Sequence, residues 1–127
     1  MLFTLDNGAL RDAYRVGRPS LEGRVLFAPS SPGEPDAAFA KLNDPIGDAA
    51  RIQAALAAHM VVRTRADADT VQARTNDTTM RDAALASGAQ WVSTDYEEPN
   101  PAFSPYTVRI WPGHDDVSTR LPTASVV

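Results

Sequence analysis

The sequence predicts an α/β protein built from parallel βα units, and two observations lead to this prediction. Short apolar runs alternate with loops and helix-like segments, which favours parallel strands joined by helical crossovers. Each run also ends abruptly in charged or hydroxyl residues, most clearly within residues 60–77 and 89–98. Buried parallel strands end in this way, and α/β proteins place their chemistry at that end of the sheet. We therefore expect a functional site where the strands end.

Two strands are expected in the first quarter of the chain. Residues 2–5 form the first one, which ends in a polar tip at Asp6 followed closely by a glycine. A short helix is expected over residues 10–16. Residues 24–28 form the second strand and run into a loop rich in proline, and residues 36–41 are expected to make a further helical turn.

A longer helix should begin at Asp44, which is an N-cap acceptor followed by proline at the first helical position. An apolar stripe continues this helix to about His59. The third strand then covers residues 60–64, so that this part of the chain forms one helix–strand unit.

The same unit is repeated further along the chain. Asn76 or Asp77 can cap another helix, which ends near Gly88, a natural C-terminal glycine. The fourth strand covers residues 90–94. Residues 106–111 are expected to form a short additional strand.

Length and charge limit the possible classes of protein. At 127 residues the chain can bury one modest core, and we expect a folded unit over residues 1–112 with a polar tail over residues 113–127. A net charge of −4, with both signs interspersed, argues against nucleic-acid binding and against a polybasic membrane anchor. No apolar run approaches the ~20 residues of a transmembrane helix.

The cellular compartment stays open. The sequence has no cysteine, which excludes a disulfide scaffold and thiolate metal sites, but many secreted enzymes also lack disulfides. The apolar opening is too short for the core of a signal peptide. We therefore expect either a cytoplasmic protein or a chain that does not begin at its natural start.

Arg63 and Arg65 are the first candidate ligand-binding residues. They lie two positions apart, so in an extended backbone they face the same side. Two guanidinium groups together favour a bidentate anion such as phosphate. The alternative is that they pair with Asp67 and Asp69 and only stiffen the loop.

Asp95 is the candidate catalytic residue, because it follows an apolar run directly. A carboxylate in this position can orient a histidine, act as a base or bind a metal, and the alternative is a turn cap after a strand. Asp6 is a similar case in a weaker context. Lys41 offers a cation near a helix start, for which the alternative is a solvated lysine.

The two histidines give no further candidates. His59 falls at a helix C-terminus, at the end of the sheet opposite the polar tips, and His114 lies in the polar tail. Neither has a partner at the spacing of a metal site, so we assign no metal ligand. Motifs for a nucleophile elbow, a P-loop or a dinucleotide-binding turn are also missing.

Several stretches together resemble the C-terminal half of the calcium-dependent phosphoinositide phospholipase C-like proteins of bacteria and fungi. They occur in the family's order at residues 5–7, 24–27, 32–39, 41–45, 62–70, 87–90 and 92–96. The segments VRTRADADT and VSTDY are the distinctive ones. The ending Thr94-Asp95 also resembles the last barrel strand of glycerophosphodiester phosphodiesterases, which belong to the same superfamily.

The resemblance implies a TIM-type (β/α)8 barrel that cleaves phosphodiesters, typically of inositol phospholipids. A complete barrel needs ~250 residues, so this chain would supply the C-terminal half within residues 1–112. The resemblance places the two catalytic histidines and most calcium ligands in the missing half. Calcium is therefore possible in the complete enzyme, but no residue of this chain is assigned to it.

The resemblance also suggests roles for individual residues. Asp95 resembles the carboxylate that orients a catalytic histidine, and Arg63, Arg65 and Tyr96 resemble contacts to the substrate head group. The full set of residues expected to contact substrate is Asp6, Lys41, Arg63, Arg65, Asp67 and Tyr96.

Two functions remain open at this point. The first is half of a phospholipase C-like phosphodiesterase, inactive alone, or a related glycerophosphodiester phosphodiesterase-like fragment. The second is a non-catalytic α/β assembly or binding module. In either case a half-barrel would expose sheet edges, so we expect it to pair with the missing N-terminal half or with further copies of itself.

Overall fold

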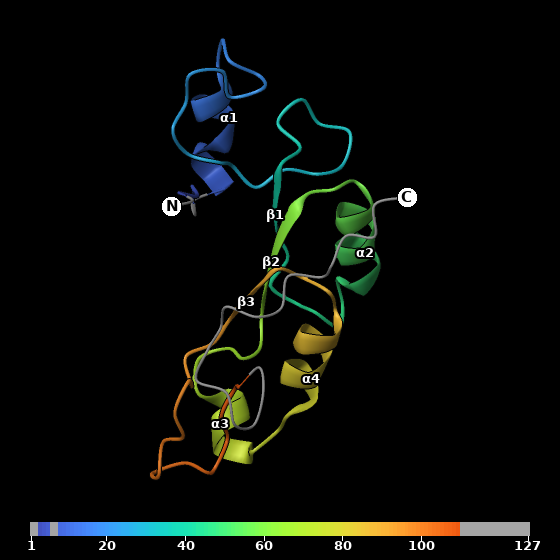
Figure 1. Ribbon diagram of the computed structural model, residues 1–127. Coiled ribbons are helices and arrows are strands. Elements are labelled where there is room, and N and C mark those ends of the chain that lie inside the picture. Colours follow the sequence, from blue (N-terminus) through green and yellow to red (C-terminus); the bar gives the residue numbers. More distant parts are fainter. Residues whose placement is uncertain (1–2, 6–7, 110–127) are drawn as a thin grey trace.

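A computed structural model describes residues 3–5 and 8–109 (Figure 1). In order, its helices and strands are η1 (Gly8–Leu10), α1 (Arg11–Arg15), β1 (Phe39–Lys41), α2 (Ala49–Ala57), β2 (Val61–Arg65), α3 (Val71–Thr75), α4 (Thr79–Ala86) and β3 (Trp91–Ser93). From β1 onward, helices separate consecutive strands. Within these residues, no helix is long and apolar enough to span a membrane.

The three strands form a parallel sheet in the order β1-β2-β3. Ala40 is level with Val62, and Thr64 is level with Val92. Two isolated parallel bridges, Thr4 to Phe27 and Pro29 to Phe39, continue the same direction on the β1 side. The predicted α/β class with parallel βα units is therefore confirmed, whereas half of a TIM-type barrel stays a prediction.

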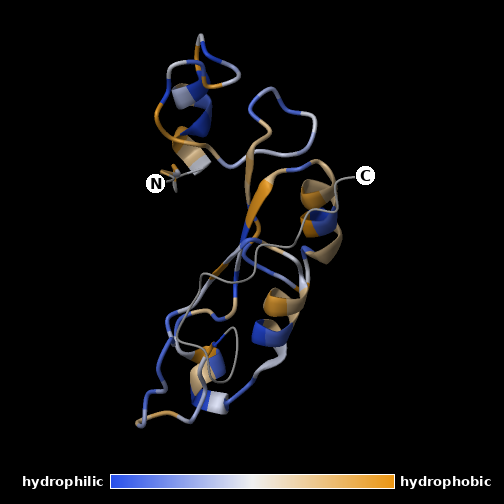
Figure 2. Cartoon of the chain, in the orientation of Figure 1, coloured by the Kyte–Doolittle hydropathy of each residue, from blue (hydrophilic) through white to orange (hydrophobic). Residues whose placement is uncertain are grey.

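Helices α2 and α4 lie along one face of the sheet (Figure 1), and both contact β2. The main apolar cluster fills the space beneath α2, with Ile52, Met60 and Val62 almost completely buried. Burial of each such side chain contributes about 1.5–3 kcal/mol. Figure 2 shows the hydrophobic start of β2 beside α2. This packing holds β2 in position. It therefore also positions the β2 side chains that point to the opposite face of the sheet, Arg63 and Arg65 among them.

The expected helix is present as α2, but it begins later than expected, because Asp44 caps a turn and not the helix. Asp44 accepts hydrogen bonds through Oδ1 from the backbone N–H groups of Ile46 (3.1 Å) and Gly47 (2.9 Å). A turn intervenes, so the regular helix begins at Ala49. His59 follows the helix with a φ of +58° and is exposed.

The expected helix between residues 76 and 88 is also confirmed. Asp77 accepts a hydrogen bond from the Thr79 N–H (2.9 Å), which starts α4, and Gly88 follows it with a φ of +81°. Glycine adopts this left-handed conformation without strain. The strands expected at residues 60–64 and 90–94 correspond to β2 and β3.

The helical turn expected over residues 36–41 is wrong, because Phe39–Lys41 is strand β1. Two of its three residues, Phe39 and Ala40, are buried, and pairing with β2 overrides the helical preference of the alanine-rich sequence. The sheet therefore has one strand that the sequence did not predict.

The N-terminal strands are shorter than expected. Among the described residues of these two segments, 3–5 and 24–28, only Thr4 and Phe27 pair with each other, in one isolated bridge. Residues 106–109 adopt no regular element, although the Val108 N–H donates to the Tyr96 carbonyl (2.9 Å). The rest of that expected strand, Asp6 and the tail at residues 113–127 lie outside the described residues.

Candidate functional site

The candidate site lies on the face of the sheet opposite α2 and α4, which we call the open face. Side chains of partners in register point to the same side of a parallel sheet, and side chains alternate along each strand. The register pairs Lys41 with Arg63, Arg63 with Trp91, and Arg65 with Ser93. These five residues define the open face. Parallel pairing therefore gathers three cations from two strands.

Arg63 occupies the middle of the open face and is half-buried. Its guanidinium donates to Asn43 Oδ1 (3.0 Å) and to Ser93 Oγ (2.9 Å). Both partners are neutral, and among the described residues no carboxylate forms an ion pair with Arg63. The guanidinium is therefore held in place while its charge remains available to an anion.

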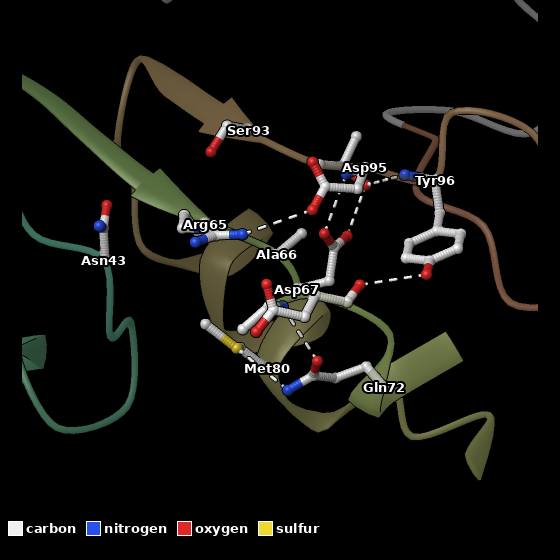
Figure 3. Close-up of polar contacts among 12 residues, drawn as sticks. Asn43, Arg65, Ala66, Asp67, Gln72, Met80, Ser93, Asp95 and Tyr96 are labelled. Carbon is white, nitrogen blue, oxygen red and sulfur yellow. Dashed lines mark hydrogen bonds and ion pairs between the residues drawn. The ribbon is translucent and has the colours of Figure 1, made fainter. Parts of the chain in front are cut away.

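Arg65 lies two residues after Arg63, at the end of β2, and pairs with Asp95. Its Nη2 atom is 3.5 Å from Asp95 Oδ2, and Figure 3 shows the two side chains reaching across the end of the sheet. The alternative raised by the sequence, in which the arginines pair with Asp67 and Asp69, does not occur. An exposed pair of this kind contributes about 0–1 kcal/mol, so an anionic ligand can replace Asp95 at small cost.

Asp67 lies behind this pair and is fully buried. Its Oδ1 atom accepts a hydrogen bond from the Asp95 N–H (2.9 Å), and its Oδ2 atom accepts one from the Thr94 hydroxyl (2.5 Å). The carboxylate thus joins the loop after β2 to the loop after β3. Its expected substrate contact stays a prediction, and its burial favours a role in positioning Asp95.

Two tyrosines close the space below the strand ends. Tyr96 is buried, and its hydroxyl donates to the Asp69 carbonyl (3.1 Å). The Tyr106 hydroxyl donates to the Ala66 carbonyl (3.0 Å). Burial, followed by the nearby charge of Asp67, raises the pKa of Tyr106 to about 12, so this phenol stays protonated at neutral pH. The head-group contact expected for Tyr96 stays a prediction.

A shallow cavity of about 350 Å³ opens on this face. It is lined by Thr4, Phe39, Lys41, Arg63, Trp91 and Ser93. The rings of Phe39 and Trp91 meet edge to face, with centroids 6.4 Å apart. A cavity lined by both cationic and aromatic side chains suits an anionic ligand that also carries a ring or an alkyl portion.

Several members of the site were not predicted, among them Phe39, Asn43, Trp91 and Ser93. Trp91 and Ser93 alternate with Asp95 along the chain, and this period of two could have placed them on one face. Asn43 follows β1, for which the sequence pattern predicts a helical turn. Asp6 and His114 lie outside the described residues, so their place in the site stays untested.

A divalent cation does not fit the residues that the structure describes. Calcium takes 6–8 oxygen ligands, but within residues 3–5 and 8–109 no group of three histidine or carboxylate side chains could hold a metal. The two carboxylates at the strand ends are also engaged, Asp67 with Thr94 and Asp95 with Arg65. We therefore derive no chemical step through a metal.

Comparison with known proteins identifies a family for the chain. No curated protein and no solved structure matches the chain significantly. The family model described as phosphoinositide phospholipase C, Ca2+-dependent, matches residues 1–119. Because this match covers almost the whole chain, the chain belongs to the Ca2+-dependent phosphoinositide phospholipase C family.

Proposed function

We propose that this chain is the C-terminal half of a phosphodiesterase barrel, which cleaves a phosphodiester of an inositol phospholipid or a related substrate. The observation that carries the proposal is Arg63, a half-buried cation on the open face that is bonded to two neutral oxygens. The family match supports phospholipase C-like chemistry in general terms.

In this proposal the open face binds the phosphodiester. Arg63 and Arg65 contact the non-bridging oxygens, since guanidinium groups match phosphate geometry, and Lys41 adds a third positive charge. The aromatic wall of Phe39 and Trp91 contacts the uncharged part of the substrate. Tyr96, Asp6 and Asp67 remain expected contacts.

Asp95 would orient a histidine supplied by the other half of the barrel. Cleavage needs a base to deprotonate the attacking hydroxyl and an acid to protonate the leaving oxygen. The one histidine in the described residues, His59, follows α2 and precedes the start of β2. It therefore lies at the opposite end of the sheet from Asp95, and we propose that the chain is inactive alone.

The proposed partner is the missing half of the barrel, and calcium would belong to the complete enzyme. β3 ends the sheet within the described residues, and Phe27, Val61 and Trp91 are 37–43% exposed. Apolar side chains on an open sheet are a common feature of surfaces that another segment covers.

Turnover of phosphatidylinositol vesicles tests the proposal. The isolated chain should release no inositol phosphate above the blank. Co-expression with a separately encoded chain whose strands end in histidine and acidic residues should restore release, and Asp95→Ala should then lower the rate by up to ~10⁴, as in hydrolytic triads. Robust turnover by the isolated chain, retained in His59→Gln, would contradict the proposed inactivity.

A non-catalytic assembly or binding module is the second candidate. The position of His59, at the end of the sheet opposite Asp95, favours it. Sedimentation of the isolated chain separates the two. A module of this shape should form a stable oligomer that covers β3, whereas half of an enzyme should remain dependent on its complementary chain. A glycerophosphodiester phosphodiesterase-like fragment is distinguished by release of glycerol phosphate from the reconstituted pair.

A further inference from the structure

We infer that Asp67 is a positioning residue whose buried carboxylate fixes the peptide of Asp95, and through it the Arg65–Asp95 pair, at the end of the open face. This inference concerns the site of the proposed function and rests on it for its biological meaning. The contacts that carry it are internal to the chain.

Three segments that are distant in sequence meet at Asp67. The first is the loop after β2, to which Asp67 itself belongs. The second is the loop after β3, because Thr94 and the Asp95 N–H both donate to the carboxylate. The third contains Tyr106, whose hydroxyl lies 3.5 Å from Asp67 Oδ2 and donates to the neighbouring Ala66 carbonyl (3.0 Å). Figure 3 shows Asp67 below the Asp95 peptide.

The arrangement requires an acceptor with two oxygens. An ionised carboxylate accepts hydrogen bonds and donates none, and here its two oxygens receive one backbone and one hydroxyl donor. The Thr94 hydroxyl in turn accepts from the Tyr96 N–H (2.9 Å), so its single proton is committed to Asp67. The donors therefore form one chain from Tyr96 through Thr94 to Asp67.

The carboxylate acts on the site through the backbone of Asp95. The Asp95 side chain is exposed and reaches Arg65 at 3.5 Å, while its N–H is fixed by Asp67 at 2.9 Å. Rotation of that peptide would swing the Asp95 side chain away from Arg65. Buried charges are costly unless paired or hydrogen-bonded, and an isosteric neutral residue would pack equally well, so packing alone does not explain a carboxylate here.

Asp67→Asn tests the inference, with Asp69→Asn as its matched control. Asp69 lies in the same loop, but its side chain is exposed and the structure uses its backbone carbonyl. Asparagine also tolerates the left-handed backbone of Asp69, which has a φ of +51°. Thr94→Val is a second variant, which removes one donor and leaves the carboxylate in place.

Nuclear magnetic resonance gives a readout that does not depend on catalysis. Asp67→Asn should move the amide proton of Asp95 and the Nε–H signal of Arg65, and Thr94→Val should move both in part. Asp67→Asn should also increase the fraction of Tyr106 ionised at pH 11, because the charge of Asp67 raises the pKa of this phenol. Arg81 and Asp82 face the same phenol and are unchanged in every variant.

Affinity for inorganic phosphate is the second readout. Asp67→Asn should strengthen phosphate binding, because it loosens the Asp95 carboxylate that an anionic ligand must replace at Arg65 and removes a negative charge behind the site, while Asp69→Asn should bind as the parent does. Unchanged Asp95 and Arg65 signals in a folded Asp67→Asn chain would overturn the inference. If these signals move but the parent chain binds no phosphate, the positioning role stands and the proposed function fails.

Discussion

The two faces of the sheet are made by the same strands but serve different purposes. On the covered face, Ala40 and Val62 pack beneath α2 with almost no exposed surface. On the open face, their neighbours Lys41 and Arg63 keep charge at the surface of a cavity. The comparison teaches that the position of a residue in the alternation along its strand decides whether its side chain enters the core or lines the cavity.

Val61 and Val62 provide the strongest test of this contrast, because they are adjacent and identical. Val62→Asp should lower the free energy of unfolding by about 3–5 kcal/mol, since it leaves an uncompensated charge in the core. Val61→Asp should change it by about 0.5 kcal/mol, as is usual for surface positions. Chemical denaturation of both variants checks the prediction, and equal effects would mean that both faces are covered.

Arg63→Gln should have the next largest effect, and it should act on binding. Hydrogen bonds to a charged group contribute about 1.5–3 kcal/mol, so phosphate affinity should fall at least about tenfold. Arg51→Gln is the control, since this arginine lies on α2, is exposed and pairs with Asp48. Calorimetric titration with phosphate measures both variants, and an equal loss would show nonspecific attraction by charge.

Tyr106→Phe should have a smaller effect, which is limited to the loops below the strand ends. It removes a hydroxyl that donates to Ala66 and leaves the ring against Tyr96. The free energy of unfolding should fall by about 0.5–1.5 kcal/mol, as measured by denaturation. A larger loss would mean that this hydroxyl stabilises parts of the fold beyond the loops at the strand ends.

Glu34 should give the smallest effect, far from the open face. The Ser31 N–H, together with Arg11 and Arg15, holds the pKa of this carboxyl below its usual value. A lowered pKa stabilises the folded state above the unfolded-state pKa of about 4.5, and this contribution is lost as the pH falls through the folded-state value. Glu34→Gln should remove this acid dependence, worth at most about 1 kcal/mol, in unfolding curves between pH 6 and 3.

The sequence predicts the repeated βα units well but the site only in part. Residues 60–64 and 90–94 were recognised because long-range pairing agrees there with local pattern, and Asp77 and Gly88 mark the ends of α4 correctly. β1 was missed because Phe39–Lys41 is short and follows alanines, so only its pairing with β2 makes it a strand. Helix α3 was missed because five residues carry too little periodicity.

The partners within the site could not be predicted from local patterns. Arg65 and Asp95 are 30 positions apart, and only the parallel register brings them together. The sequence suggested that the arginines pair with Asp67 because it is close along the chain. In the structure β2 ends at Arg65, and Asp67 is buried in the loop that follows, where it accepts a hydrogen bond from the Asp95 N–H instead.

The central claim is that the open face binds the phosphate of a phosphodiester. Nuclear magnetic resonance titration of the whole chain with inorganic phosphate tests it most directly. We expect saturable shifts at Lys41, Arg63 and Ser93, with none at Ile52 or Ala55 on α2. Absence of saturable shifts on the open face, or equal shifts on α2, would contradict it.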